Sequence, residues 1–70
     1  MTTYKVLSVS QANNSAVRVG DIVYSLRGPD YGLASHDTLC TGIEHRSVTF
    51  KPDGDYPSFT IPVKDLEKLS

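Results

Sequence analysis

The sequence predicts an all-β fold, a small barrel of five short strands followed by a short C-terminal helical turn. Two observations favour this class. Apolar and polar residues mostly alternate, which is the two-residue period of a strand, and the apolar runs are short and separated by turn-forming residues. The chain has 70 residues, a length suited to one domain, so residues 1–70 are expected to form a single barrel.

The first two strands are predicted at residues 4–9 and 22–27. Residues 4–9 are rich in side chains that favour extended backbone, and the polar residues 10–15 that follow are predicted to form a loop. In the second strand Ile22, Tyr24 and Leu26 alternate with the other side chains. We therefore expect these three to face the core.

Two further strands are predicted at residues 39–44 and 46–50, the second with Val48 and Phe50 facing inward. Residues 51–55 read Lys-Pro-Asp-Gly-Asp. Pro presets φ, Asp tolerates the middle of a turn and Gly accepts positive φ, so a hairpin is predicted there. A fifth strand is expected where Phe59 and Ile61 alternate with polar residues.

The C-terminal residues are expected to form one or two turns of helix. Pro62 can begin a helix, and Val63, Leu66 and Leu69 recur every three residues, which suits a helical face lying on the barrel. The side chains predicted to face the core are Val6, Val9, Val19, Ile22, Tyr24, Leu26, Leu39, Ile43, Val48, Phe50, Phe59, Ile61 and Leu66.

Composition limits the classes of partner. Cys40 is the single cysteine, which excludes a disulfide within the chain, and a lone thiol without a signal-like start is expected of a cytoplasmic protein. The longest apolar run, residues 22–24, is far short of the roughly 20 residues that span a bilayer, so no membrane partner is expected. Seven basic and eight acidic residues are interspersed for a net charge of −1, which argues against binding to duplex nucleic acid.

Two segments are similar to SH3-like small barrels. Residues 19–24 read Val-Gly-Asp-Ile-Val-Tyr, similar to the Gly-Asp-x-Val entry into a strand of such barrels. Residues 61–66 read Ile-Pro-Val-Lys-Asp-Leu, similar to the proline-led turn that closes SH3 folds. SH3 domains bind proline-rich peptides in aromatic grooves, commonly with a Trp, and this chain has none, so that ligand class is disfavoured.

Three other patterns resemble short uncharacterised proteins of bacteriophages and proteobacteria. They are Asp-Tyr-Gly-Leu-Ala at residues 30–34, Thr-Gly-Ile-Glu-His at 41–45 and Gly-Asp-Tyr-Pro at 54–57. The resemblance implies a bacteriophage or proteobacterial origin, with the host cell cytoplasm as location if the chain is phage-encoded. It implies no particular activity.

The sequence predicts a protein that is not an enzyme. Ser35, His36 and Asp37 are the residue types of a catalytic triad, but neighbours along an extended chain point apart, whereas triad members must face one another. The His, Cys and carboxylate residues lack zinc-site spacing, so no metal or cofactor is expected.

The candidate binding segment is the connection at residues 27–38, which is longer than the two to five residues usual in a hairpin. It combines flexible glycines with aromatic, apolar and imidazole side chains, and the planar fork of an arginine suits phosphate. The predicted ligand-binding residues are Arg27, Asp30, Tyr31, Gly32, Leu33, Ser35, His36, Arg46 and Tyr56.

Two hypotheses of function remain open. In the first, the chain is a phage-type anti-defence protein that sequesters a small nucleotide-derived signal, as a homo-oligomer because a small barrel has a thin stability margin. In the second, it is a protein-interaction module, an inhibitor or adaptor that docks on a bacterial protein. Nucleic-acid binding is a weaker third alternative. The sequence favours the first hypothesis slightly over the second.

Overall fold

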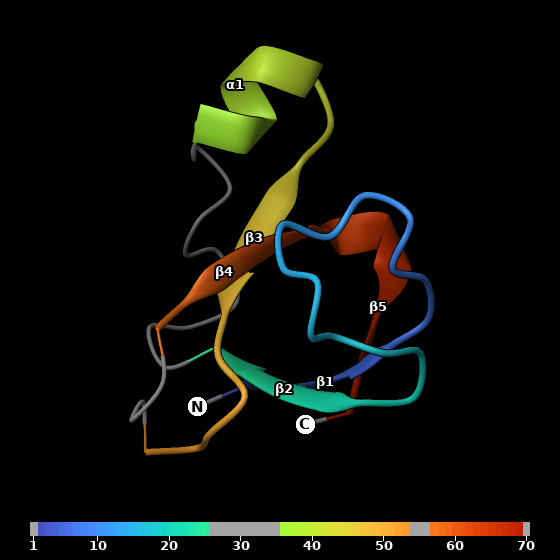
Figure 1. The fold of residues 1–70 in the computed structure, drawn as a ribbon, viewed down its shortest axis with the longest axis vertical. Helices are drawn as coiled ribbons and strands as arrows, with labels where there is room; N and C mark the ends of the chain where they lie inside the picture. Colours follow the sequence, from blue (N-terminus) through green and yellow to red (C-terminus); the bar gives the residue numbers. More distant parts are fainter. Residues whose placement is uncertain (1, 26–35, 54–56, 70) are drawn as a thin grey trace.

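The computed structural model describes residues 2–25, 36–53 and 57–69, and this part of the chain is mostly β-structure (Figure 1). Its elements in chain order are β1 (Thr2–Val6), β2 (Ile22–Ser25), α1 (His36–Thr41), β3 (His45–Val48), β4 (Phe59–Pro62), the single 3-10 turn η1 (Val63–Asp65) and β5 (Leu66–Lys68). No helix in these ranges is both long enough and apolar enough to cross a membrane.

The strands form two antiparallel sheets. The first has three strands in the order β2-β1-β5, and the second is the β3-β4 hairpin. An isolated bridge joins them, in which Tyr24 and Thr49 each donate a backbone hydrogen bond of 2.9 Å to the other. The strands that the structure describes therefore run β5-β1-β2-β3-β4 across the two sheets, and their ladders do not close into one barrel.

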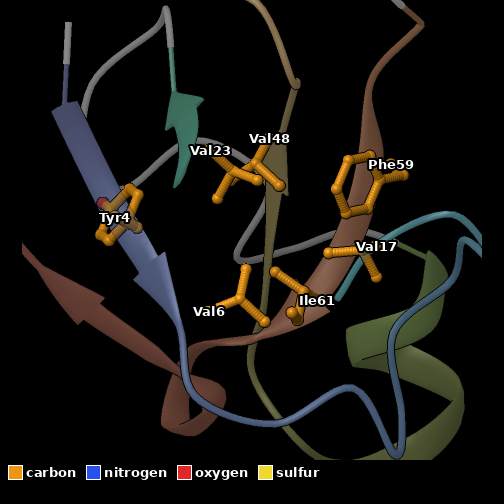
Figure 2. Close-up of a cluster of buried hydrophobic side chains, with 7 residues drawn as sticks. All are labelled: Tyr4, Val6, Val17, Val23, Val48, Phe59 and Ile61. Atoms are coloured by element: carbon orange, nitrogen blue, oxygen red, sulfur yellow. The ribbon is translucent and has the colours of Figure 1, made fainter. Parts of the chain in front are cut away.

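The hydrophobic core lies between the two sheets (Figure 2). Alternation directs every second side chain of each strand inward, so one sheet contributes aromatic and β-branched side chains that meet those of the other. Phe50 packs on Phe59 with the ring centroids 4.9 Å apart. The buried apolar residues are Tyr4, Val6, Val17, Val23, Val48, Phe59 and Ile61.

The inward face of β2 is opposite to the one predicted. Val23 is 0% exposed and Ser25 is buried, whereas Ile22 is 39% exposed and Tyr24 is half-buried. Both faces of this strand carry apolar side chains, so its own pattern does not decide its orientation. Pairing with β1 decides it, because Val23 lies opposite Tyr4 on the core side.

The predicted strand at residues 39–44 is wrong, because residues up to Thr41 belong to helix α1. The helix ends where Gly42 takes a φ of +73° and its N–H donates to the carbonyl of Thr38, 2.9 Å away. A glycine with positive φ is a common way for a helix to end. Leu39, predicted to face the core, is consequently 77% exposed, and Cys40 is exposed as well.

The predicted C-terminal helix is also wrong beyond its first turn. Only Val63–Asp65 are helical, and the chain then returns to extended backbone at Leu66 to form β5. The free edge of β1 accounts for this, because Val6 pairs with Leu66 and Tyr4 with Lys68. Hydrogen bonding to a neighbouring strand satisfies more backbone groups than a short exposed helix.

The other predicted strands lie close to their expected places. β1 begins and ends earlier than the predicted 4–9, β3 overlaps 46–50 and β4 contains 59–61. Pro52 and Asp53 form a turn within the predicted hairpin. Gly54 and Asp55 of that hairpin lie outside the described residues, and so does Leu26, which was predicted to face the core. Of the predicted core residues, Val6, Val48, Phe59 and Ile61 are buried, Phe50 and Leu66 pack against them partly buried, Ile43 is half-buried, and Val9 and Val19 are exposed.

Candidate functional site

Strand β3 carries an arginine on its core-facing side. Val48 points into the core, and Arg46 lies two residues earlier on the same strand, so both side chains share that face. Arg46 also lies opposite the core residue Ile61 in the hairpin register. Its side chain is only 7% exposed, which places a permanently charged guanidinium among apolar neighbours.

The guanidinium of Arg46 lies over an aromatic ring from the other sheet. Its Cζ is 5.4 Å from the centroid of the Tyr4 ring, and Tyr4 is 4% exposed at the centre of β1. A cation over the face of an aromatic ring is stabilised by the ring quadrupole, by about 2 kcal/mol when both groups are desolvated. A cation–π contact of this kind provides no hydrogen-bond acceptor for the N–H groups of the guanidinium.

Several polar atoms of the described residues are buried without a hydrogen-bond partner. Arg46 Nε and Nη1 are two of them, and Tyr4 Oη is a third. Asp65 Oδ2, on the turn η1, is a fourth. Nearly all buried polar groups in proteins are hydrogen-bonded, and a buried donor left alone costs about 1–3 kcal/mol, more when it is charged.

Among the described residues no ion pair neutralises Arg46. Among residues 2–25, 36–53 and 57–69, the ion pair found joins Lys64 Nζ to Asp65 Oδ1 across 3.9 Å, and none includes Arg46. Lys64 is largely exposed, so this pair contributes little. The region around Arg46 and Tyr4, which we call the Arg46 site, therefore carries a positive charge that no ion pair within residues 2–25, 36–53 and 57–69 compensates.

His45 is buried beside this site but has a different role. Its backbone N–H donates to Thr38 Oγ1 over 2.9 Å, and its Nδ1 lies 2.7 Å from the carbonyl oxygen of Ile43. A carbonyl only accepts, so Nδ1 donates this bond. Alternation directs His45 away from the face that carries Arg46. These bonds attach the start of β3 to helix α1 and the turn that follows it.

The structure places one of the predicted ligand-binding residues, Arg46, in full detail. His36 begins α1, and its side chain lies outside the described residues. The others also lie outside them: Arg27, Asp30, Tyr31, Gly32, Leu33, Ser35 and Tyr56. Within the described ranges no group of three or more His, Cys, Asp or Glu side chains could hold a metal ion.

Sequence reasoning did not identify Tyr4 as part of the Arg46 site. For Tyr4 the signal was present, because it alternates with Val6 and so shares the inward face of β1. The predicted inward face of residues 46–50 likewise contains Arg46, two residues before Val48. That the two side chains meet follows only from the packing of one sheet on the other.

No family model, no curated protein and no solved structure matches the chain.

Proposed function

We propose that this chain is a non-enzymatic binding protein that holds a small anionic ligand at Arg46 and Tyr4. The observation that carries the proposal is the buried guanidinium with two unpartnered nitrogens and no carboxylate in reach among the described residues. An uncompensated buried charge is costly, so its presence calls for a group that neutralises it. An anionic ligand would supply both the opposite charge and the missing acceptors.

The ligand class that we propose is a small nucleotide-derived signal. Arginine binds phosphate well because its planar fork can donate two parallel hydrogen bonds to one phosphoryl group. The ring that the guanidinium lies over carries a further donor, the Tyr4 hydroxyl, which also lacks a partner. The predicted binding segment at residues 27–38 joins β2 to α1 and is part of the proposed binding surface.

The proposal includes an SH3-like architecture for the chain. The strand order β5-β1-β2-β3-β4, with a single 3-10 turn before the last strand, supports it. The biological role that we propose is sequestration of the signal by a phage-type anti-defence protein in the host cytoplasm. Its support is the resemblance of the short patterns at residues 30–34, 41–45 and 54–57.

We also propose that the protein forms a homo-oligomer. The outer face of the three-stranded sheet carries Ile22 and Leu69 on either side of β1, and both are exposed. Burial of these side chains between two copies would add apolar area to a small core. Light scattering after size exclusion would show a mass above that of the 7.7 kDa monomer, and Ile22→Glu would reduce it.

The experiment that tests the ligand proposal is titration calorimetry of the full chain. The probes are inorganic phosphate, ADP, ADP-ribose and a cyclic dinucleotide, each tested against the native chain, Arg46→Met and Lys5→Gln. Lys5 is the control because it neighbours Tyr4 on β1 but is exposed on the other face. Binding that Arg46→Met abolishes and Lys5→Gln preserves supports the proposal. Absence of binding by every probe contradicts it.

A second function is supported by exposed apolar side chains in and next to the strands of the first sheet and in the segment between β1 and β2. Leu7, Val19, Ile22 and Leu69 are all exposed among residues 2–25 and 57–69. A protein-interaction module would use such a surface to dock on a bacterial protein. Capture of one stoichiometric protein from a bacterial lysate, lost on Ile22→Glu and kept on Arg46→Met, would favour this function over the first.

A further inference from the structure

The three-stranded sheet has an outer face, on the side away from β3 and β4, that carries exposed apolar side chains (Figure 1). Alternation directs Lys5 and Leu7 outward, because Val6 between them points into the core. Glu67 lies opposite Lys5, and Leu69 follows two residues later on the same face. Leu7 is 48% exposed and Leu69 is 50% exposed, although the outer face of an antiparallel sheet in water is ordinarily polar.

The centre of this outer face carries one charge of each sign. Lys5 of β1 and Glu67 of β5 are opposite each other in the register, and both are exposed. Among residues 2–25, 36–53 and 57–69 the ion pair that forms joins Lys64 to Asp65, so Lys5 and Glu67 do not pair within the chain. An amine and a carboxylate side by side, neither in an ion pair, are complementary in charge to a second copy of the same face.

We infer that the protein is a two-fold dimer in which the two outer faces pack on each other and Lys5 of each chain pairs with the partner's Glu67. This inference rests on the homo-oligomer proposed above and specifies its interface. A two-fold axis that runs along the strands, between β1 and β5, places β1 of each copy over β5 of the other. Packed sheets lie about 10 Å apart, a distance that a lysine and a glutamate side chain together span.

The same axis brings apolar side chains together. Leu69 lies next to the partner's Leu69 on one side of the charged row, and Leu7 lies next to the partner's Leu7 on the other, because backbone hydrogen bonds of 2.8 Å extend the β1-β5 ladder to both residues. Ile22, opposite Lys5 on β2, lies at the rim. A two-fold axis over β1, or one that crosses the strands at Lys5, would place Lys5 against the partner's Lys5, and such contacts between like charges are destabilising.

The test measures the dissociation constant of the dimer by sedimentation velocity on full-chain variants. Lys5→Glu and Glu67→Lys each create two like-charge contacts across the axis and are expected to weaken the dimer at least about hundredfold. Lys5→Gln creates no repulsion and should weaken it by about tenfold or less, because exposed ion pairs contribute little. Lys68→Glu is the matched control, since it makes the same change of charge on the other side of β5, opposite Tyr4. It should weaken the dimer less than about threefold.

Charge exchange separates contacts between chains from contacts within one chain. In each single variant two like charges also face each other on the same sheet, which destabilises the fold. The double variant Lys5→Glu/Glu67→Lys is expected to dimerise within about threefold of the native protein, because it restores opposite charges. An equimolar mixture of the two single variants should form mixed dimers. Each chain in that mixture keeps its own like-charge pair, so only opposite charges across the axis account for the recovery.

The outcomes distinguish this interface from the proposed homo-oligomer. Dimers that recover both in the double variant and in the mixture support the inference. A native oligomer that Lys5→Glu leaves intact keeps the homo-oligomer and overturns the interface. Single variants that dissociate, with a mixture that stays monomeric, also overturn it, because the loss then arises within each chain. A native chain that is monomeric overturns the homo-oligomer and the inference together, and leaves the outer face to a bacterial protein.

Discussion

Arg46 of β3 lies against the ring of Tyr4 of β1, so the one contact joins a charged side chain of the two-stranded sheet to an aromatic side chain of the three-stranded sheet. The pair is buried, and the polar atoms Arg46 Nε, Arg46 Nη1 and Tyr4 Oη lack hydrogen bonds. The guanidinium of Arg46 thus lies where the two sheets meet. The Tyr4 ring stabilises its charge, whereas the loss of hydrating water destabilises it.

Replacement of Arg46 by methionine is expected to stabilise the ligand-free protein. Methionine has similar length, makes favourable contacts with aromatic rings and removes the uncompensated charge. The expected gain in the free energy of unfolding is about 1–4 kcal/mol, the range seen when buried charges are replaced by apolar side chains. Urea denaturation measures it, with Lys5→Met as an exposed control. A loss of more than about 3 kcal/mol would show that Arg46 has a buried partner.

The hydroxyl of Tyr4 is expected to affect binding and not folding. Tyr4→Phe keeps the ring under Arg46 and removes one unpartnered buried oxygen. Stability should be unchanged or higher by about 1 kcal/mol, while affinity for the anionic ligand falls by about tenfold. Denaturation and calorimetry on the same preparation check both. Unchanged affinity would remove Tyr4 Oη from the site.

The orientation of β2 can be tested by a pair of truncations. Val23→Ala removes methyl groups from the core and should lower the free energy of unfolding by about 1–3 kcal/mol. Ile22→Ala, on the exposed face of the same strand, should cost under about 1 kcal/mol even though more atoms are removed. The reverse ranking in urea denaturation would contradict the observed register.

The backbone conformation at Gly42 is expected to favour glycine over other residues. A Cβ built there meets nothing within 4 Å, so a substitution causes no clash, but φ is +73°. Gly42→Ala should therefore destabilise the protein by about 1 kcal/mol, and Gly42→Asn by less, because asparagine tolerates this region better. Thermal unfolding of the two variants distinguishes conformational strain from packing. Equal melting temperatures would argue against the positive φ.

Ligand association is expected to be slow for a small molecule. Nε and Nη1 of Arg46 are buried in the ligand-free structure, so covering side chains must move before an anion can reach them. Such a step lowers association rates below about 10⁵ M⁻¹s⁻¹. Stopped-flow fluorescence with a labelled nucleotide would measure the rate. A diffusion-limited rate would place the ligand on the protein surface and not at Arg46.

The strands that the sequence predicts well are those whose apolar residues occupy one face. Val48 with Phe50, and Phe59 with Ile61, indicate β3 and β4 close to their true positions. β2 has apolar side chains on both faces, so its inward side depends on pairing with β1 and could not be read locally.

The sequence predicts the wrong class of structure for two segments, residues 39–44 and the C-terminal residues. Residues 39–44 contain apolar and polar residues in an order compatible with a strand, and the helix end is set by Gly42 instead. The three-residue spacing of Val63, Leu66 and Leu69 suggested a helix, but β1 offers an edge that only an extended chain can use. A strand distant in sequence thus decides the structure of the C-terminal residues, whereas α1 ends at a glycine next to it in sequence.

The Arg46 site was predicted in part. The chemistry of arginine predicts Arg46 as a phosphate ligand, but it does not predict that this side chain lies in the core. Its partner Tyr4 is separated from it by most of the chain, and no local pattern reports a contact between two sheets. Such long-range contacts depend on how the strands order themselves, which single-strand periodicity does not encode.

The bridge between Tyr24 and Thr49 is one of several backbone links between the two sheets. Among the described strands it is the place where backbone hydrogen bonds connect β2 to the chain leaving β3. A second link is the N–H of Asn13, between β1 and β2, which donates to the carbonyl of Thr60 in β4, 2.9 Å away, and a third is the covalent chain that continues from β4 through η1 into β5. Directional hydrogen bonds and chain connectivity therefore fix how one sheet lies on the other, and non-directional packing of the core fills the space between them.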